Sequence, residues 1–133
     1  MAKVAYTLSI LDGAFCICRL ESGAKTPDWV LGLDFFSITR TREELSIVAP
    51  EGVLGEEVLP VGAELESGWA CMKVEGPLEL SLVGVLAELS GTLAEAGISI
   101  FVVSTYDTDY VLVRNEDLDG AIRALSGAGH LIR

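Results

Sequence analysis

Apolar and polar side chains alternate along several stretches of the chain, with the two-residue period of β-strands. Residues 4–11 and 15–20 show this alternation. Each stretch is expected to form a half-buried strand whose apolar face packs on a core. A third stretch has Ala70, Met72 and Val74 on one face and Cys71, Lys73 and Glu75 on the other.

After Gly76 and Pro77 the apolar period changes to that of an amphipathic helix. Polar residues occupy the opposite face, so the spacing predicts a helix of about four turns. Gly97 is expected to end it, because glycine adopts the left-handed conformation without strain. The apolar positions recur at steps of three and four, at Leu82, Leu86, Leu89, Leu93 and Ala96.

Residues 98–105 are apolar at nearly every position and rich in β-branched side chains, which predicts a central strand covered on at least one face. A turn and a second strand follow, over residues 106–109 and 110–114. Asn115 is a suitable N-cap for a second helix, and residues 130–132 can add a short strand. The order β-α-β-β-α-β is the ferredoxin-like arrangement. The second helix has its apolar stripe at Leu118, Ile122 and Leu125.

The first half of the chain repeats part of this pattern. A shift of 65 positions places residues 38–48 over residues 103–113, and both segments are strand, polar turn and strand. A shift of 63 positions places residues 10–13 over residues 73–76. These matches indicate an internal duplication.

The first copy departs from the second where its first helix should be. Residues 15–20 alternate as a strand there, and residues 22–28 form a polar loop. We therefore predict an α+β fold of two ferredoxin-like (βαββαβ) modules, the first degenerate, with its first helix reduced or missing. The predicted modules span residues 1–66 and 67–133.

Composition excludes several classes of protein. Half of the 133 residues are apolar, enough for a core and too many for a disordered chain. Nine basic residues against twenty acidic ones give a net charge of −11. This balance argues against nucleic acid and anionic membranes as partners, because both need clustered Lys and Arg. The longest uncharged stretch, residues 96–106, is shorter than the ~20 residues of a membrane span.

The compartment is expected to be the cytoplasm. The N-terminal apolar stretch alternates like a strand, which argues against a signal peptide. Cys16, Cys18 and Cys71 are odd in number and have apolar neighbours, as reduced and buried thiols do.

Candidate catalytic residues are few, and no metal or cofactor is expected. His130 is the one histidine and has no nucleophile on a tight turn near it, so we interpret it as a polar residue of the last edge strand. The three cysteines lack the spacing of a zinc site. No glycine-rich phosphate loop is present in the sequence.

Asp107 and Asp109 offer one catalytic alternative. Paired aspartates after an apolar strand can hold magnesium and attack a phosphoryl group. Such a phosphotransferase needs a large parallel sheet after the motif, and the chain is too short for one. A strand follows at once, so the aspartates are expected in a hairpin turn, where Asp is favoured.

The chain contains four motifs, at residues 37–41 (SITRT), 44–48 (ELSIV), 97–101 (GISIF) and 104–109 (STYDTD). They resemble those of tandem ACT-domain proteins of the aspartokinase-like and cytosolic arginine-sensor type. The resemblance covers nearly the whole chain and is weakest over residues 21–34. It implies a non-catalytic regulatory protein that binds a small molecule, most often an amino acid, where two ACT modules meet. It also implies a homodimer that regulates a separate protein.

The resemblance also implies where a ligand binds. Backbone N–H groups at a helix N-terminus favour a carboxylate, and glycine allows a close approach. Asp109, at the hairpin, would meet a cationic group of the ligand. The strand-to-helix turn corresponds to Gly76, Pro77 and Leu78, the helix start to Ser81, Leu82, Val83 and Gly84, and the second strand of a neighbouring module to Ser99 and Ile100.

Two features leave a different function open. The first module has residues 42–44 (REE) where the second has residues 107–109 (DTD), so at most one site of this type is expected per chain. The alternative function is a dimerising scaffold that binds no ligand. Its interface could use the aromatic residues Trp29, Phe35, Phe36 and Trp69.

Overall fold

In the computed structural model, which describes residues 4–54, 59–76 and 83–133, the chain divides into two units. The discontinuous unit consists of residues 1–12 and 70–133, and the internal unit of residues 13–69. The second boundary falls within strand β5 (Glu64–Val74). Each unit has its own hydrophobic core.

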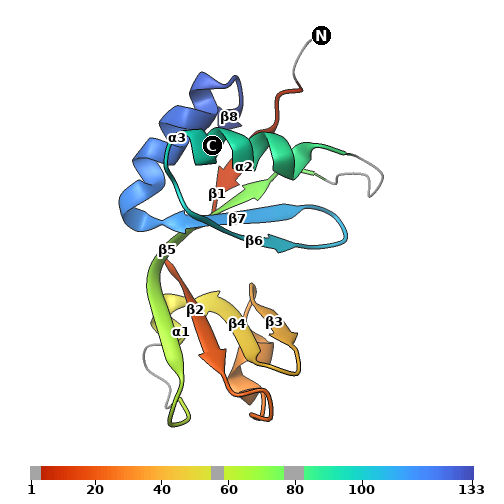
Figure 1. The fold of residues 1–133 in the computed structure, drawn as a ribbon, viewed down its shortest axis with the longest axis vertical. Coiled ribbons are helices and arrows are strands. Elements are labelled where there is room, and N and C mark those ends of the chain that lie inside the picture. Colours follow the sequence, from red (N-terminus) through yellow and green to blue (C-terminus); the bar gives the residue numbers. More distant parts are fainter. Residues whose placement is uncertain (1–3, 55–58, 77–82) are drawn as a thin grey trace. The chain divides into compact units, whose positions relative to one another are not determined.

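The discontinuous unit contains five of the described strands, in the order β8-β1-β5-β7-β6. β1 is antiparallel to β5 and parallel to β8, and β6 and β7 form an antiparallel hairpin. Helices α2 and α3 lie on one face of this sheet (Figure 1). The elements are β1 (Thr7–Ile10), β6 (Ile100–Ser104), β7 (Asp109–Arg114), β8 (Leu131–Ile132), α2 (Val85–Glu95), the 3-10 helix η2 (Asn115–Asp117) and α3 (Leu118–Gly127).

The core of this unit forms between the helices and one sheet face. Leu89 and Leu93 of the predicted helical stripe are fully buried in α2, and Leu125 is fully buried in α3. Leu82 lies outside the described residues. The sheet contributes Leu8, Ala70, Met72, Val74, Val111 and Val113.

Both helices end at glycines, and Gly97 ends α2 as predicted. Gly97 has a φ of +75°, and the Ile98 N–H donates to the Leu93 carbonyl at 3.0 Å. This is a Schellman motif, which satisfies carbonyls of the last helical turn. Gly129 ends α3 in the same way, with a φ of +98°. The predicted N-cap at Asn115 was wrong, because η2 precedes α3 and the N-cap position is Asp117.

The internal unit has the strand order β3-β4-β2-β5. This is the order of a βαββαβ module in which β2 is the first strand and β5 the fourth. The 3-10 helix η1 takes the place of the first helix, and a four-residue α1 that of the second. The elements are β2 (Phe15–Leu20), η1 (Asp28–Gly32), β3 (Ser37–Arg40), β4 (Leu45–Pro50) and α1 (Glu51–Leu54). Its core comprises Cys16, Cys18, Leu20, Val30, Leu45, Ile47 and Ala49.

The predicted fold class is therefore confirmed, with a different assignment of the first strands. Residues 15–20 form the first strand of the internal unit, not a strand in the place of a helix. β1 instead pairs with β5 and β8 in the discontinuous unit. The boundaries of the two units therefore differ from the predicted division between residues 66 and 67, because β1 pairs with strands far along the sequence.

One burial prediction also needs correction. β6 was expected to be a central strand, but among the described residues it pairs with β7 alone and lies at the sheet edge. Its side chains from Ile100 to Val103 are half-buried. A strand's apolar residues show that something covers it, not which neighbour does so.

Candidate functional site

The β6–β7 hairpin is closed by a threonine turn. The Thr105 N–H donates to the Thr108 carbonyl at 2.8 Å, and the Thr108 N–H donates to the Thr105 hydroxyl at 3.2 Å. Such side-chain bonds to nearby backbone groups favour turns. Thr41 and Glu44 close the β3–β4 hairpin with the same pair of bonds, at 2.8 and 3.1 Å. The two hairpins therefore correspond at a shift of 64 positions, not the predicted 65.

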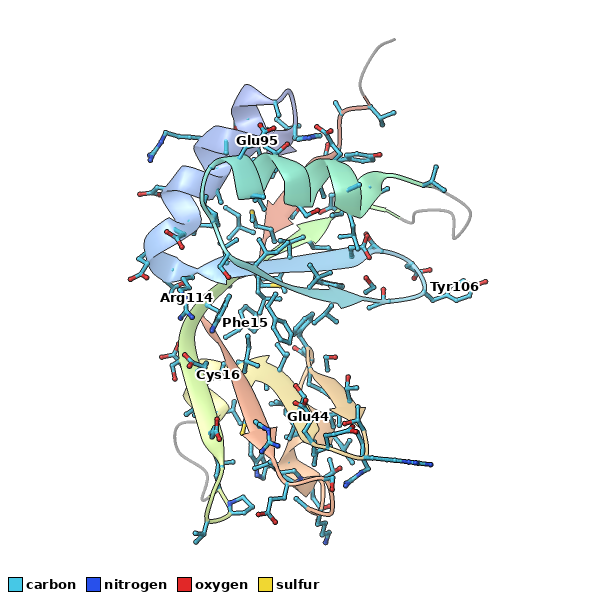
Figure 2. All side chains as sticks on the ribbon, viewed as in Figure 1. Phe15, Cys16, Glu44, Glu95, Tyr106 and Arg114 are labelled. Atoms are coloured by element: carbon cyan, nitrogen blue, oxygen red, sulfur yellow. The ribbon has the colours of Figure 1, made fainter. Side chains whose placement is uncertain are left out.

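Thr108 fastens the β6–β7 hairpin to β5. Its side chain is almost entirely buried, and its hydroxyl donates to the Val74 carbonyl. The tip residue Tyr106 is exposed, and Figure 2 shows it pointing away from the turn. The position of the turn relative to the end of β5 is thus set by a buried hydrogen bond.

A cavity of about 240 Å³ lies beside this contact. Gly76 contributes the start of the strand-to-helix turn, and Asp107 contributes a carboxylate from the hairpin. Successive side chains of a strand point to opposite faces of the sheet. Met72 and Val74 face the helices, so Lys73 projects from the other face. The lining among the described residues is Lys73, Gly76, Asp107 and Thr108.

The charged side chains near the cavity differ in whether they already have partners. The Glu75 carboxylate accepts a hydrogen bond from Ser9 and lies 3.7 Å from the Arg133 guanidinium. The Ser9 bond, with the charges of Lys73 and Arg133, holds the pKa of Glu75 below its usual value. Within the described part of the chain, neither Lys73 nor Asp107 has an ion-pair or hydrogen-bond partner of its own.

The structure places the residues implied by the resemblance at several points of the discontinuous unit. Gly76 lines the cavity, while Pro77, Leu78, Ser81 and Leu82 lie outside the described residues. Val83 and Gly84 are exposed just before α2. Gly84 occupies the N-cap position with a φ of +88° and gives no side-chain cap.

The other three implied residues do not line the cavity. Asp109 is half-buried at the start of β7, opposite Ser104, and does not line the cavity. Ser99 is exposed before β6, and Ile100 pairs with Val113 at the end of β6 far from the turn. A strand rise of about 3.3 Å per residue separates that end from the turn by roughly 13 Å.

Sequence reasoning missed Lys73 and Thr108 as lining residues. The alternation of β5 already placed Lys73 on the face away from the core. At the correct shift of 64 positions, Thr108 aligns with Glu44, and the two residues occupy the same place in their turns. The shift of 65 positions concealed that match.

His130 is buried beneath the N-terminal segment, directly before β8. Its Nδ1 accepts a hydrogen bond from the Tyr6 N–H at 3.0 Å, and the Tyr6 ring stacks on it at 5.6 Å. Its Nε2 lies 3.4 Å from Glu88 Oε1. Both ring nitrogens therefore face groups of the fold, and the interpretation of His130 as a structural residue is supported.

The cysteines are buried thiols, as predicted. The Cys16 thiol donates to the Ser67 hydroxyl at 3.4 Å. Burial raises the pKa of Cys16 and Cys18 and raises that of Cys71 to about 12. Thiolates, the nucleophilic form, are thus disfavoured at all three positions.

Among the described residues no group of three or more His, Cys, Asp or Glu side chains is arranged to hold a metal ion. None of the helices in that part of the chain has the length and apolar content needed to cross a bilayer.

Both units thus contain the strands of a ferredoxin-like module, and in the discontinuous unit β1 is inserted between β5 and β8. The comparisons with known proteins specify the family. A model described as an ACT domain matches residues 64–127, and a model for an N-terminal domain matches residues 13–57. The chain is therefore an ACT-domain protein.

Among curated relatives, the cytosolic arginine sensor for mTORC1 subunit 1 of Bos taurus is 31% identical over 100 residues. The match covers 69% of this chain and 30% of that relative. The human protein of the same name is 30% identical over 100 residues, with the same coverage. This chain therefore spans less than a third of the length of these relatives.

Two solved structures extend the comparison to the whole fold. A protein from Agrobacterium tumefaciens is 37% identical with a TM-score of 0.87, over 98% of this chain and 94% of that one. The regulatory subunit of aspartate kinase from Thermus thermophilus has a TM-score of 0.63, over 88% and 93% of the two chains. Its identity is 16%, so the likeness is one of fold.

Proposed function

We propose that this protein is a non-catalytic regulator that binds an amino acid at an interface between ACT modules. The observation that carries the proposal is the cavity at the end of β5, lined by Gly76 and by residues of the β6–β7 hairpin. It offers a cation, a carboxylate and a glycine backbone within one small space. An amino acid presents the complementary ammonium and carboxylate.

The start of α2 supports the same proposal. A helix N-terminus has unsatisfied backbone N–H groups and a positive dipole, which favour a carboxylate. Gly84 supplies no side-chain cap for these groups. The turn and helix start, with Asp109, Ser99 and Ile100, remain the proposed ligand contacts.

We propose a cytoplasmic homodimer as the functional form. One side of edge strand β6 has no partner among the described residues. Tyr106, at the hairpin tip, is 79% exposed. Exposed strand edges pair readily with other chains, and exposed apolar groups near a pocket mark interaction surfaces. A second copy would cover both features and complete the site, and the regulated protein would be a separate chain.

Thermal unfolding with each of the standard amino acids at millimolar concentration tests the function. A ligand that binds only the folded state, at about 100 times its Kd, adds roughly 2.7 kcal/mol to the free energy of unfolding. We expect one or a few amino acids to raise the Tm by several degrees. If none does so while light scattering shows a dimer, the scaffold function replaces this proposal.

A further inference from the structure

We infer that Lys73 and Asp107 form a charge pair that binds the head group of the amino acid, Lys73 contacting its carboxylate and Asp107 its ammonium. This inference rests on the proposed function and adds two residues that the family resemblance did not indicate. It assigns the cationic contact to Asp107 within the cavity rather than to Asp109 outside it.

The first argument is that the charge of Lys73 is available to a ligand. Glu75, two residues along the same face, is already engaged by the Ser9 hydroxyl and lies 3.7 Å from Arg133. Lys73 is half-buried and lines the cavity. A partly desolvated ammonium without an ion-pair partner among the described residues is well suited to bind an anion.

The second argument is that Asp107 is held in position by its neighbours. Thr105 and Thr108 close the turn around it with hydrogen bonds of 2.8 to 3.2 Å. Thr108 also bonds to the carbonyl of Val74, the residue next to Lys73. One buried hydrogen bond therefore fixes the hairpin to the strand that carries the opposite charge, and such support preorganises a binding site.

The third argument concerns the kind of ligand. The cavity volume of about 240 Å³ is below the 300–1,000 Å³ typical of pockets for drug-sized ligands. No large apolar side chain is among its described lining residues. The cavity therefore suits the charged head group of one amino acid better than its side chain. Loss of either charge of the ligand should abolish most of the binding.

Calorimetric titration of the full chain tests this assignment. The probes are the amino acid that raises the Tm most, its carboxamide and its N-acetyl derivative. We expect Lys73→Met and Asp107→Asn each to weaken binding of the free amino acid by about ten- to a hundredfold, because each removes a charge-assisted hydrogen bond. Lys73→Arg, which keeps the charge, should restore most of the affinity.

Two changes in ligand selectivity would identify the separate roles of Lys73 and Asp107. Lys73→Met should no longer distinguish the amino acid from its carboxamide, and Asp107→Asn should no longer distinguish it from its N-acetyl form. Lys25→Met removes an exposed lysine of the internal unit and should leave the affinity unchanged. The Tm without ligand shows whether each variant is folded.

Each contrary result has a distinct meaning. Unchanged affinity in both variants, with binding by the wild type, overturns this inference and leaves the proposed function standing. Loss of binding in Asp109→Asn but not in Asp107→Asn also overturns it and favours the residue that the resemblance implied. Absence of binding by any amino acid to the wild type contradicts both.

Discussion

The internal and discontinuous units are built on the same module, with β1 inserted between β5 and β8 in the discontinuous unit, but they differ in what covers their sheets. The internal unit has a five-residue 3-10 helix and a four-residue α-helix where the discontinuous unit has α2 and α3, of 11 and 10 residues. Its core is formed largely by strand residues, with contributions from η1. The comparison shows that the module's strand order survives the loss of its helices.

The hairpins of the two units share the same turn but differ in how they are attached to the rest of the sheet. Both turns have the same threonine hydrogen bonds, but Glu44 stands where the other hairpin has Thr108. The Thr108 hydroxyl bonds to β5 beside the strand-to-helix turn. The turn is thus common to both units, whereas the anchored hairpin and the cavity beside it belong to the discontinuous unit.

The largest expected effect tests the helical core of the discontinuous unit. Leu93 is fully buried and accepts the Ile98 N–H of the Schellman motif through its backbone. Leu93→Ala should lower the free energy of unfolding by about 2–5 kcal/mol, the range for buried leucines. Leu31→Ala, at a 60% exposed position of the internal unit, should change it by less than about 0.5 kcal/mol. Equal effects in chemical denaturation would contradict the described packing.

The second effect concerns Cys71, the buried thiol of the discontinuous unit, at alkaline pH. The folded-state pKa of Cys71 is raised from 9.0 to about 12, so burial favours the neutral thiol. Stability from this group is complete below pH 9 and is lost as pH rises toward 12, because only the unfolded chain then releases the proton. The expected loss is about 1.4 kcal/mol per pH unit. Cys71→Ala should flatten the alkaline decline of stability relative to the wild type, and an identical slope would oppose this account.

The third effect separates the two hairpins. Thr108→Val removes a buried hydrogen bond and should cost about 1–3 kcal/mol, because the Val74 carbonyl loses a donor. Thr41→Val, in the exposed turn of the internal unit, should cost less than 1 kcal/mol by the same rule. Denaturant midpoints measure both. A larger loss of stability in Thr41→Val than in Thr108→Val would contradict the claim that the buried bond of Thr108 contributes more.

The smallest effect concerns Glu75 at acidic pH. Its pKa is lowered from 4.5, chiefly by the Ser9 hydrogen bond, so its stabilising effect is present above the unfolded-state pKa. This effect is lost as pH falls through the lower folded-state pKa. The stability difference between wild type and Glu75→Gln should therefore shrink below pH 4.5, as followed by urea unfolding. A difference that grows on acidification would contradict the sign of this pKa shift.

Local patterns predicted much of the discontinuous unit. The stripe through Leu89 and Leu93, the glycine at position 97 and the β6–β7 hairpin each depend on residues close in sequence. The partners of β1 could not be predicted, because strand pairing depends on residues more than 60 positions away. For the same reason the sequence could not show that β6 lies at an edge.

The candidate site was predictable only in part. Gly76 follows from a break in the strand pattern and from the family resemblance. The place of Asp107 depends on a hydrogen bond between Thr108 and Val74, 34 residues apart. Two aspartates in one short turn are equivalent in sequence, and only the folded hairpin distinguishes the one that lines the cavity.

The most direct test of the central claim is a titration of the isotopically labelled full chain, followed by backbone amide NMR shifts. The ligand is the amino acid that stabilises the protein most. We predict saturable shifts concentrated at Gly76, Asp107, Thr108 and the start of α2, which disappear in Lys73→Met. Shifts confined to the internal unit, or none at millimolar ligand, would contradict the claim that this cavity binds an amino acid.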